Sequence, residues 1–292
     1  GFTAAVFHLV NHATFKGALF MITGAVDHVT GTRDVKKLGG LLTIMPISFT
    51  ITVITALSMA GIPPFNGFLS KEKFLEAMIE ISHANVFSLD TLGIVFPILA
   101  IVGSIFTFVY SIKFIMYIFF GKHQPNALPK KAHEASILML LSPIILAVLV
   151  VVFGLFPGLL TQSIVEPATT AISGMSNVNA EFHLFHGITP AFISTLIIWI
   201  LGILLLLTFS YWIRLLHAQP TRLTLNHWYD STGKYLPNYS ANMTNSYVNG
   251  YVRDSLVIIF GMLIVVTIVT LLSVPFDFNF KDINNIHIYE IA

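Results

Sequence analysis

The stretch AVFHLVNHATFKGALFMITG, residues 5–24, decides the fold of this chain because it is apolar enough to sit in lipid. It nevertheless carries His8, His12 and Lys16, each four residues after the one before. At about 100° per residue, a helix places all three on one side, in a stripe roughly 12 Å long that Thr23 extends. A charge at mid-bilayer costs at least about 2.5–3.5 kcal/mol. The sequence therefore predicts a membrane helix whose polar stripe faces a protein interior or a hydrated cavity.

Composition supports a membrane environment for the whole chain. Of its 292 residues, 55% are hydrophobic and only 10% are charged, and the mean hydropathy is +0.81. A soluble domain is about 25% charged. The net charge of +1 argues against a nucleic-acid partner, and the absence of cysteine excludes disulfides and thiolate metal sites. These features predict an all-α fold, a polytopic transmembrane helix bundle.

The predicted spans follow the apolar runs, since a span needs about 20 mostly apolar residues. The chain starts directly on such a run, without the charged segment of a signal peptide. We therefore expect it to be a piece of a longer polypeptide with more spans upstream. Residues 161–187 are interpreted as a polar stretch and residues 214–254 as a loop region. The six predicted spans are residues 2–26, 41–60, 92–120, 136–160, 190–213 and 255–274.

A second unusual stretch is GIPPFNGFLSKEKFLEAMIE, residues 61–80. Its two prolines lack amide protons and break any helix that leaves the second span, and a glycine relaxes the backbone on either side. Broken helices at membrane depth are tolerated only where they line a cavity. Lys71 and Glu72 come just after the break, although an ordinary interfacial loop with a charged cap is an open alternative. The expected hinge residues are Gly61, Pro63, Pro64 and Gly67.

The charges within the spans favour transport over catalysis. A single histidine in a span is usually a hydrogen-bonding contact between helices, but three titratable groups in a row favour a proton or ion path. Lys113, in SIFTFVYSIKFIMYIFFG (residues 104–121), is a further candidate, as is Thr23. Lys113 is also close enough to the end of its span for its ammonium group to extend to the membrane surface.

Enzymatic and metal chemistry have little support in the sequence. His183 and His186 are only three residues apart, which is a weak metal signal without a third ligand. No glycine-rich phosphate loop or nucleophile motif is present in the sequence. We therefore predict no enzyme, no cofactor and no metal site.

Four segments resemble one family. FHLVNHATFKGALFMITGAVDHVTGTRDVKKLGGL (residues 7–41), SMAGIPPFNGFLSKEKFLE (58–76), SIFTFVYSIKFIMYIFFGK (104–122) and NHWYDSTGKYLPNYSANMTNSYVNGYVRDSL (226–256) are similar to the A-type subunit of multisubunit Mrp/Mnh-type Na+/H+ antiporters. The first two resemble, more distantly, the antiporter-like membrane subunits of NADH:quinone oxidoreductase. The TGTRD turn and the PPFNGFLSKE string favour the antiporter subunit.

This resemblance implies a fold and a set of roles. Residues 1–121 would belong to an antiporter-like proton-translocating domain, starting in the second of two inverted five-helix repeats, and residues 122–292 would form C-terminal membrane helices. His8, His12 and Lys16 would line the proton path, with Lys71 at its end and Glu72 tuning it. The implied partners are other subunits of a hetero-oligomeric antiporter in the bacterial cytoplasmic membrane, with lipid, H+ and Na+. The alternatives are a proton-pumping subunit of NADH:quinone oxidoreductase and a non-transporting scaffold.

The course of residues 64–82 is the main topological question. If they cross the membrane, the basic residues divide seven to four between the two sides, and if they are re-entrant the division is ten to three. The positive-inside rule alone prefers the re-entrant arrangement. The resemblance implies a crossing, because the inverted repeat constrains the geometry more strongly than charge counting does. The expectation is therefore that residues 64–82 cross.

Overall fold

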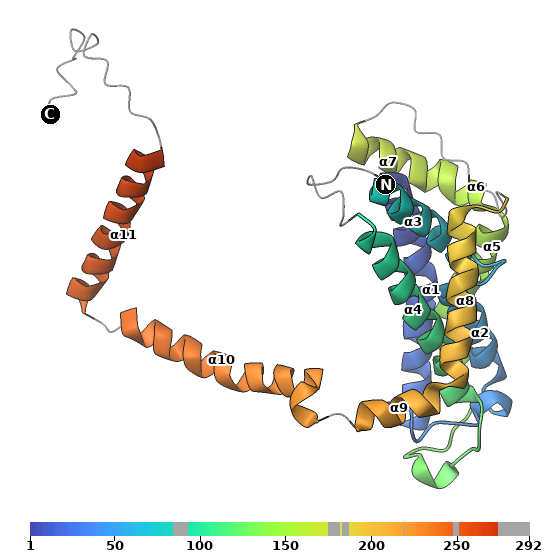
Figure 1. Cartoon of the computed structure of the whole chain (residues 1–292). Helices are drawn as coiled ribbons and strands as arrows, with labels where there is room; N and C mark the ends of the chain where they lie inside the picture. Colours follow the sequence, from blue (N-terminus) through green and yellow to red (C-terminus); the bar gives the residue numbers. More distant parts are fainter. Residues whose placement is uncertain (84–92, 175–181, 183–186, 219, 248–250, 274–292) are drawn as a thin grey trace. The chain divides into compact units, whose positions relative to one another are not determined.

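The structure is a computed structural model that describes residues 1–83, 93–174, 182, 187–218, 220–247 and 251–273 (Figure 1). In these ranges the regular structure is entirely helical, which confirms the predicted all-α fold. Contacts divide the chain into two units, Gly1–Trp212 and Ile213–Ala292. The predicted functional division at residues 121/122 is a different one and stays a prediction.

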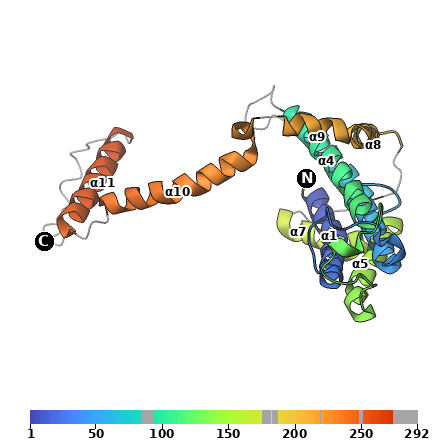
Figure 2. The ribbon, with the colours of Figure 1, turned by 90° about the horizontal axis from the view of Figure 1, so that it is seen from below.

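The first unit contains most of the helices. Helix α9 (Phe209–His217) begins in this unit and ends in the second. Helix α1 (Phe2–Thr30) lies beside α5 (Ile137–Leu155), and the two views agree on this (Figures 1 and 2). The other helices are α1 (Phe2–Thr30), α2 (Pro46–Ala60), α3 (Asn66–His83), α4 (Val95–Phe119), α5 (Ile137–Leu155), α6 (Pro157–Leu160), α7 (Glu166–Ser173) and α8 (Pro190–Leu207), with short 3-10 or π turns at Leu41–Thr43, Pro125–Ala127 and Thr161–Val165.

The second unit is described by itself. It contains a 3-10 turn (Thr221–Leu223), α10 (Leu225–Tyr247) and α11 (Val252–Ser273). Helix α11 is apolar, and none of its residues is buried. Helix α10 lies in a region that we interpreted from sequence as a loop. That interpretation was wrong because a polar helix with an internal proline, Pro237, gives no hydropathy signal.

Four helices are long and apolar enough to cross a membrane within the described residues: α4, α5, α8 and α11. Helix α1, with 29 residues, also has the length, but its polar stripe lowers its hydropathy. Helix α2 has only 15 residues and measures roughly 22 Å, which is short of the roughly 30 Å hydrocarbon layer. Residues 41–60 therefore do not form a complete span of their own, contrary to the prediction from their hydropathy.

The loops after α1 and after α4 meet at one end of the first unit. The amide of Gly40 donates to the carbonyl of Phe120 at 3.0 Å, and the amide of Lys130 donates to the carbonyl of Thr30 at 3.2 Å. These bonds bring together the C-terminal ends of α1 and α4 and the N-terminal ends of α2 and α5. We call this the basic end, because its loops carry Arg33, Lys36, Lys37, Lys122, Lys130 and Lys131.

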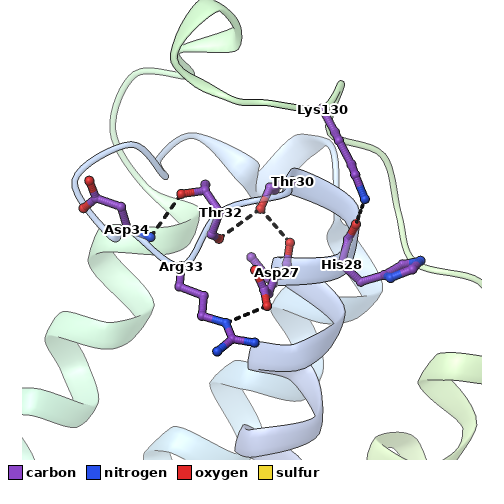
Figure 3. Close-up of polar contacts among 8 residues, drawn as sticks. Asp27, His28, Thr30, Thr32, Arg33, Asp34 and Lys130 are labelled. Atoms are coloured by element: carbon purple, nitrogen blue, oxygen red, sulfur yellow. Dashed lines mark hydrogen bonds and ion pairs between the residues drawn. The ribbon is translucent and has the colours of Figure 1, made fainter.

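Side chains reinforce the basic end (Figure 3). The Arg33 guanidinium donates to the Asp27 carboxylate at 2.7 Å, and this contact raises the pKa of Arg33. The Lys130 ammonium donates to the carbonyl of His28 at 3.1 Å and ties the second loop to the end of α1 (Figure 3). These contacts fix the two loops against each other.

The start of α2 is capped from the loop before α5. The Glu134 carboxylate accepts hydrogen bonds from the amide of Ile47 at 2.8 Å and from the hydroxyl of Ser48 at 2.6 Å. A carboxylate at a helix N-terminus satisfies free amide groups and interacts favourably with the helix dipole. This contact places the beginning of α2 at the basic end.

Helix α3 continues in the direction of α2, away from the basic end. Asn66, its first residue, contacts Asn11 and Thr14 in α1, and Ser70 one turn later contacts His8. Residue numbers thus rise along α3 as they fall along α1. Helices α2 and α3 together return the chain across the unit once, with an interruption at residues 61–65.

This course corrects the expectation that residues 64–82 cross on their own after a complete span at residues 41–60. Helices α2 and α3 together traverse the unit once, so Arg33, Lys36 and Lys37 share an end with Lys122, Lys130 and Lys131. Residue Lys281, which entered the charge count, lies outside the described residues. The positive-inside rule predicts that the basic end faces the cytoplasm.

Cysteine labelling tests this topology cleanly, because the chain has no cysteine. We expect single cysteines at Lys36 and at Lys122 to resist a membrane-impermeant maleimide in intact cells and to react in everted vesicles. A cysteine at Ile188, an exposed residue before α8, should show the opposite pattern. Labelling of Lys36 and Lys122 from opposite sides would contradict the shared crossing of α2 and α3.

The region after α5 differs from its sequence interpretation. Residues 161–173, predicted to be a polar stretch, are helical and continue from α6 through a π turn into α7. Figure 1 shows α6 and α7 lying across the upright α1 and α8. The turns pack because Leu160 and Val165 are buried against Phe7 near the start of α1. An apolar contact every few residues holds this segment although its composition is polar.

Candidate functional site

The polar stripe of α1 lies where α2, α3 and α4 approach it. The rings of His8 and His12 are 5.9 Å apart between centroids, and His8 Nδ1 is 3.2 Å from the hydroxyl oxygen of Ser70 in α3. The Lys16 ammonium donates to the sulfur of Met59 in α2 at 3.8 Å. The three predicted groups follow one another along α1, and His8 and Lys16 contact α3 and α2, respectively.

Two cavities adjoin the stripe. The first has a volume of about 380 Å³ and contains the predicted groups of α1 and α3, together with hydroxyl groups of α4. We call it the histidine cavity, and it is lined by His8, His12, Phe15, Met59, Lys71, Phe74, Leu99, Ala100, Gly103, Ser104, Thr107 and Tyr110. It brings together two histidines and a lysine that are about 60 residues apart in sequence.

The second cavity has a volume of about 640 Å³ and is mostly apolar and aromatic. We call it the lysine cavity, because two ammonium groups are its only charges among the described residues. Its lining is Lys16, Leu19, Phe20, Thr23, Val35, Met59, Phe106, Val109, Tyr110, Lys113, Phe114, Tyr117 and Phe209. The four predicted α1 groups are thus divided between the cavities: the two histidines line one, and Lys16 with Thr23 lines the other.

Lys71 is placed by the interruption between α2 and α3. Its ammonium nitrogen is buried and has no hydrogen-bond partner in the described part of the chain. Gly61 ends α2 in the left-handed conformation with φ of 78°, and a Cβ atom there would lie 2.8 Å from Lys71 Cδ. A glycine at this point therefore both allows the turn and leaves room for the lysine side chain.

Four buried polar residues hold the interruption together, and sequence reasoning missed them. The Asn66 side-chain amide donates to Asn11 Oδ1 at 2.9 Å and to the Thr14 hydroxyl at 3.0 Å. The Ser58 hydroxyl donates to Asn66 Oδ1 at 2.7 Å and accepts from the amide of Gly67 at 3.0 Å. We call Asn11, Thr14, Ser58 and Asn66 the amide network. The signal that could have revealed it is two asparagines within apolar stretches, since buried polar groups need partners.

The hinge residues take two positions. Pro63 and Pro64 lie in the interruption itself, whereas Gly67 lies in the first turn of α3. A Cβ atom at Gly67 would overlap the carbonyl oxygen of Ser58, so α2 and α3 approach each other more closely there than any larger residue allows. The carbonyl of Pro64 in turn lies against Gly154 of α5. The absence of a side chain at Gly67 and at Gly154 thus allows the interruption to pack closely against its neighbours.

Glu72 lies apart from the cavities and does not pair with Lys71. It is 6% exposed, and its carboxylate is hydrogen-bonded to the side chain of Thr189, before α8. Consecutive residues of a helix point about 100° apart, so Lys71 and Glu72 face different neighbours. Within the described residues, the notion that Glu72 tunes Lys71 by direct contact has no support in the geometry.

The two further candidates both line the lysine cavity. The Lys113 ammonium nitrogen is buried without a hydrogen-bond partner in the described ranges, 5.0 Å from the centre of the Tyr117 ring and in contact with the ring of Phe209. It therefore does not extend to the surface of this unit. The Thr23 hydroxyl donates to the carbonyl of Leu19 at 2.8 Å, so it is satisfied within its own helix.

Metal ligation has no support in the part of the chain that the structure describes, where no group of three histidine or carboxylate side chains comes together. His183 and His186 lie outside the described residues. Imidazole and amine groups, which can take up and release protons, line the two cavities.

Comparisons with known proteins point to one kind of membrane protein. The family model described as NADH:quinone oxidoreductase/Mrp antiporter, TM, matches residues 1–97, which include α1, α2 and α3. The A1 subunit of a Na(+)/H(+) antiporter of Staphylococcus epidermidis strain ATCC 35984 is 70% identical over 292 residues, which cover 100% of this chain and 36% of that protein. The A1 subunit of Staphylococcus aureus strain Newman is 71% identical over 291 residues, again 36% of its length. The chain thus spans about a third of these relatives.

Two solved structures match most of this chain. A chain in the structure of the Mrp complex from Dietzia sp. DQ12-45-1b matches 94% of this chain with a TM-score of 0.67 at 28% identity, over 28% of its own length. A chain of the membrane-bound sulfane sulfur reductase, an archaeal respiratory membrane complex, matches 91% of this chain with a TM-score of 0.50 at 20% identity, over 47% of its own length. The second match shows a shared fold alone.

Proposed function

We propose that this chain, which is 70–71% identical to part of the A1 subunits of Na(+)/H(+) antiporters, is a membrane subunit of such an antiporter and forms part of a proton-translocation path. The observation that supports this most directly is the histidine cavity, where His8 and His12 of α1 meet Lys71 of α3. Two helices from different parts of the sequence contribute titratable groups to one space. Ionisable groups inside membrane segments mark ion and proton pathways more often than packing sites.

The proposed mechanism is proton transfer along α1. Neutral imidazoles at His8 and His12 accept and release protons through water, and Lys16 and Lys71 hold a proton at either side of them. A proton on one group raises the electrostatic energy of a proton on the next, because both lie in a medium of low dielectric constant. Occupancy therefore alternates along the path. Such alternation could couple inward proton movement to outward sodium movement in the complete antiporter.

The remainder of the protein and its partners belong to the same proposal. Since the chain spans 36% of its relatives, we propose that the rest of the full-length polypeptide supplies the other half of the path, and that further subunits complete the complex. Residues 1–121 would then be the translocating part and residues 122–292 an attached set of helices. We propose sodium and protons as the transported ions, and no nucleic acid or cofactor takes part in this mechanism.

Replacing Lys16 with Ala in the complete antiporter tests the proposal. We expect Na+-dependent proton efflux in everted vesicles to fall at least about tenfold, because a central proton carrier would be lost. Lys37→Ala, at an exposed position of the basic end, is the control and should transport normally. The amount of assembled complex is measured in parallel. Normal antiport by the Lys16→Ala variant would reduce the stripe to a packing element.

Two other functions are distinguishable from this one. A proton-pumping subunit of NADH:quinone oxidoreductase would use the same chemistry, but the relatives at 70–71% identity are named antiporter subunits. A non-transporting scaffold would keep full antiport after His12, Lys16 and Lys71 are neutralised together. A triple variant that still assembles but has lost transport would exclude the scaffold.

A further inference from the structure

The two cavities share only two of their lining residues, Met59 of α2 and Tyr110 of α4. Each basic group of the proposed path lines one cavity or the other: His8, His12 and Lys71 line the histidine cavity, and Lys16 lines the lysine cavity. A proton that moves directly from the lysine cavity to the histidine cavity therefore passes the Met59–Tyr110 pair.

The contacts of this pair are unusual. The Tyr110 hydroxyl donates to the Met59 sulfur at 3.6 Å, and the Lys16 ammonium donates to the same sulfur at 3.8 Å. The Lys16 nitrogen is also 5.7 Å from the centre of the Tyr110 ring. A thioether is a weak hydrogen-bond acceptor. Two strong donors thus converge on an acceptor that each can leave at little cost.

Met59 separates the cavities physically. Its side chain is 5% exposed and packs with Phe15 and Ala56 in the core. An unbranched, polarisable side chain of this kind fills an irregular gap and also changes rotamer easily. Of the two residues that line both cavities, Tyr110 is the one with a hydroxyl group, and it is 47% exposed.

We propose that Met59 and Tyr110 form a gate between the lysine and histidine cavities, in which the Tyr110 hydroxyl relays protons. This inference rests on the proposed proton path and adds the element that controls it. In the forward step, the hydroxyl oxygen accepts a proton from the Lys16 ammonium while its own proton passes to water in the histidine cavity. Lys16 loses one proton, the histidine cavity gains one, and the tyrosine is unchanged once its hydroxyl has rotated back. Met59 keeps the water of the two cavities apart, so transfer requires the hydroxyl.

Tyr110→Phe in the complete antiporter tests the relay, because it removes the hydroxyl and keeps the ring. We expect the rate of Na+-dependent proton efflux, normalised to assembled complex, to fall at least about tenfold. Tyr211→Phe, at a tyrosine of α9 that lines neither cavity, is the control and should transport normally. The rate ratio between H2O and D2O gives a readout that altered packing would not move. It should rise in the Tyr110→Phe variant, as proton transfer becomes the slow step.

A second variant tests the separation. Adding Met59→Ala to Tyr110→Phe removes the sulfur and leaves room for one or two water molecules, each of which needs about 30 Å³. We expect the double variant to transport at least about threefold faster than Tyr110→Phe alone, because water would replace the hydroxyl. A double variant no faster than Tyr110→Phe would overturn the gate.

The outcomes separate the gate from the proposed function. Full activity of Tyr110→Phe together with loss of activity in Lys16→Ala would overturn the gate and leave the path intact. Full activity of both variants would overturn the path, and the gate with it. A loss in Tyr110→Phe with an unchanged D2O ratio would assign Tyr110 a packing role and also overturn the relay.

Discussion

Replacing Gly67 with Ala is expected to destabilise the protein, although alanine is the better helix former by about 0.5–1 kcal/mol. The added Cβ atom would overlap the carbonyl oxygen of Ser58 and lie 2.7 Å from its hydroxyl oxygen. The carbonyl oxygen is a backbone atom, so no change of rotamer relieves the overlap. Overpacking of this kind costs about 1–3 kcal/mol or more. The α3 helix would have to move away from α2.

That movement would also disturb the amide network, because Gly67 follows Asn66 and its own amide donates to Ser58. We therefore expect the thermal midpoint of the purified complex in detergent to fall by several degrees and antiport to fall with it. Gly24→Ala is the matched control: it is also a helical glycine, and a Cβ atom there would meet nothing within 4 Å. It should be neutral or slightly stabilising. Equal midpoints for the two variants would show that α2 and α3 are not in the close contact described.

The part of the site that follows from local geometry could be predicted from the sequence. Residues four apart share a face of a helix whatever surrounds them, so the stripe of His8, His12 and Lys16 needed no knowledge of the fold. The break was predictable for the same reason, since prolines and glycines act on the backbone where they stand. The identity of their neighbours was not predictable. Asn66 and Asn11 are 55 residues apart, and only the folded chain brings their side chains together.

Errors arose where composition and conformation diverge. Residues 41–45 are as apolar as the span that follows them, but they form a 3-10 turn and a linker in which Leu41 and Met45 are fully buried. Hydropathy therefore extended the second span beyond the start of α2. For α10 the error was to miss a helix, because its residues are mostly polar and show no hydrophobic pattern. Hydropathy reports burial in lipid or protein, and it reports helix only indirectly.

Stability and function are expected to oppose each other at Lys71. Its ammonium nitrogen is buried with no hydrogen-bond partner among the described residues, and a charge in such a position costs several kcal/mol. Met has nearly the same length and no charge. The Lys71→Met variant should therefore raise the thermal midpoint of the complex by several degrees while it lowers antiport at least about tenfold, because the histidine cavity would lose its lysine.

Lys73→Met on the same helix provides the comparison for this prediction. The Lys73 ammonium is partly exposed and pairs with the Glu76 carboxylate at 2.7 Å, so its charge is already solvated and compensated. A surface pair of this kind contributes about 0–1 kcal/mol, and its loss should leave both the midpoint and antiport almost unchanged. The contrast between two lysines two residues apart isolates burial as the cause. A Lys71→Met complex that is less stable than the parent would contradict this prediction. It would mean that a partner in the assembled antiporter binds the Lys71 ammonium and offsets the free-energy cost of its burial.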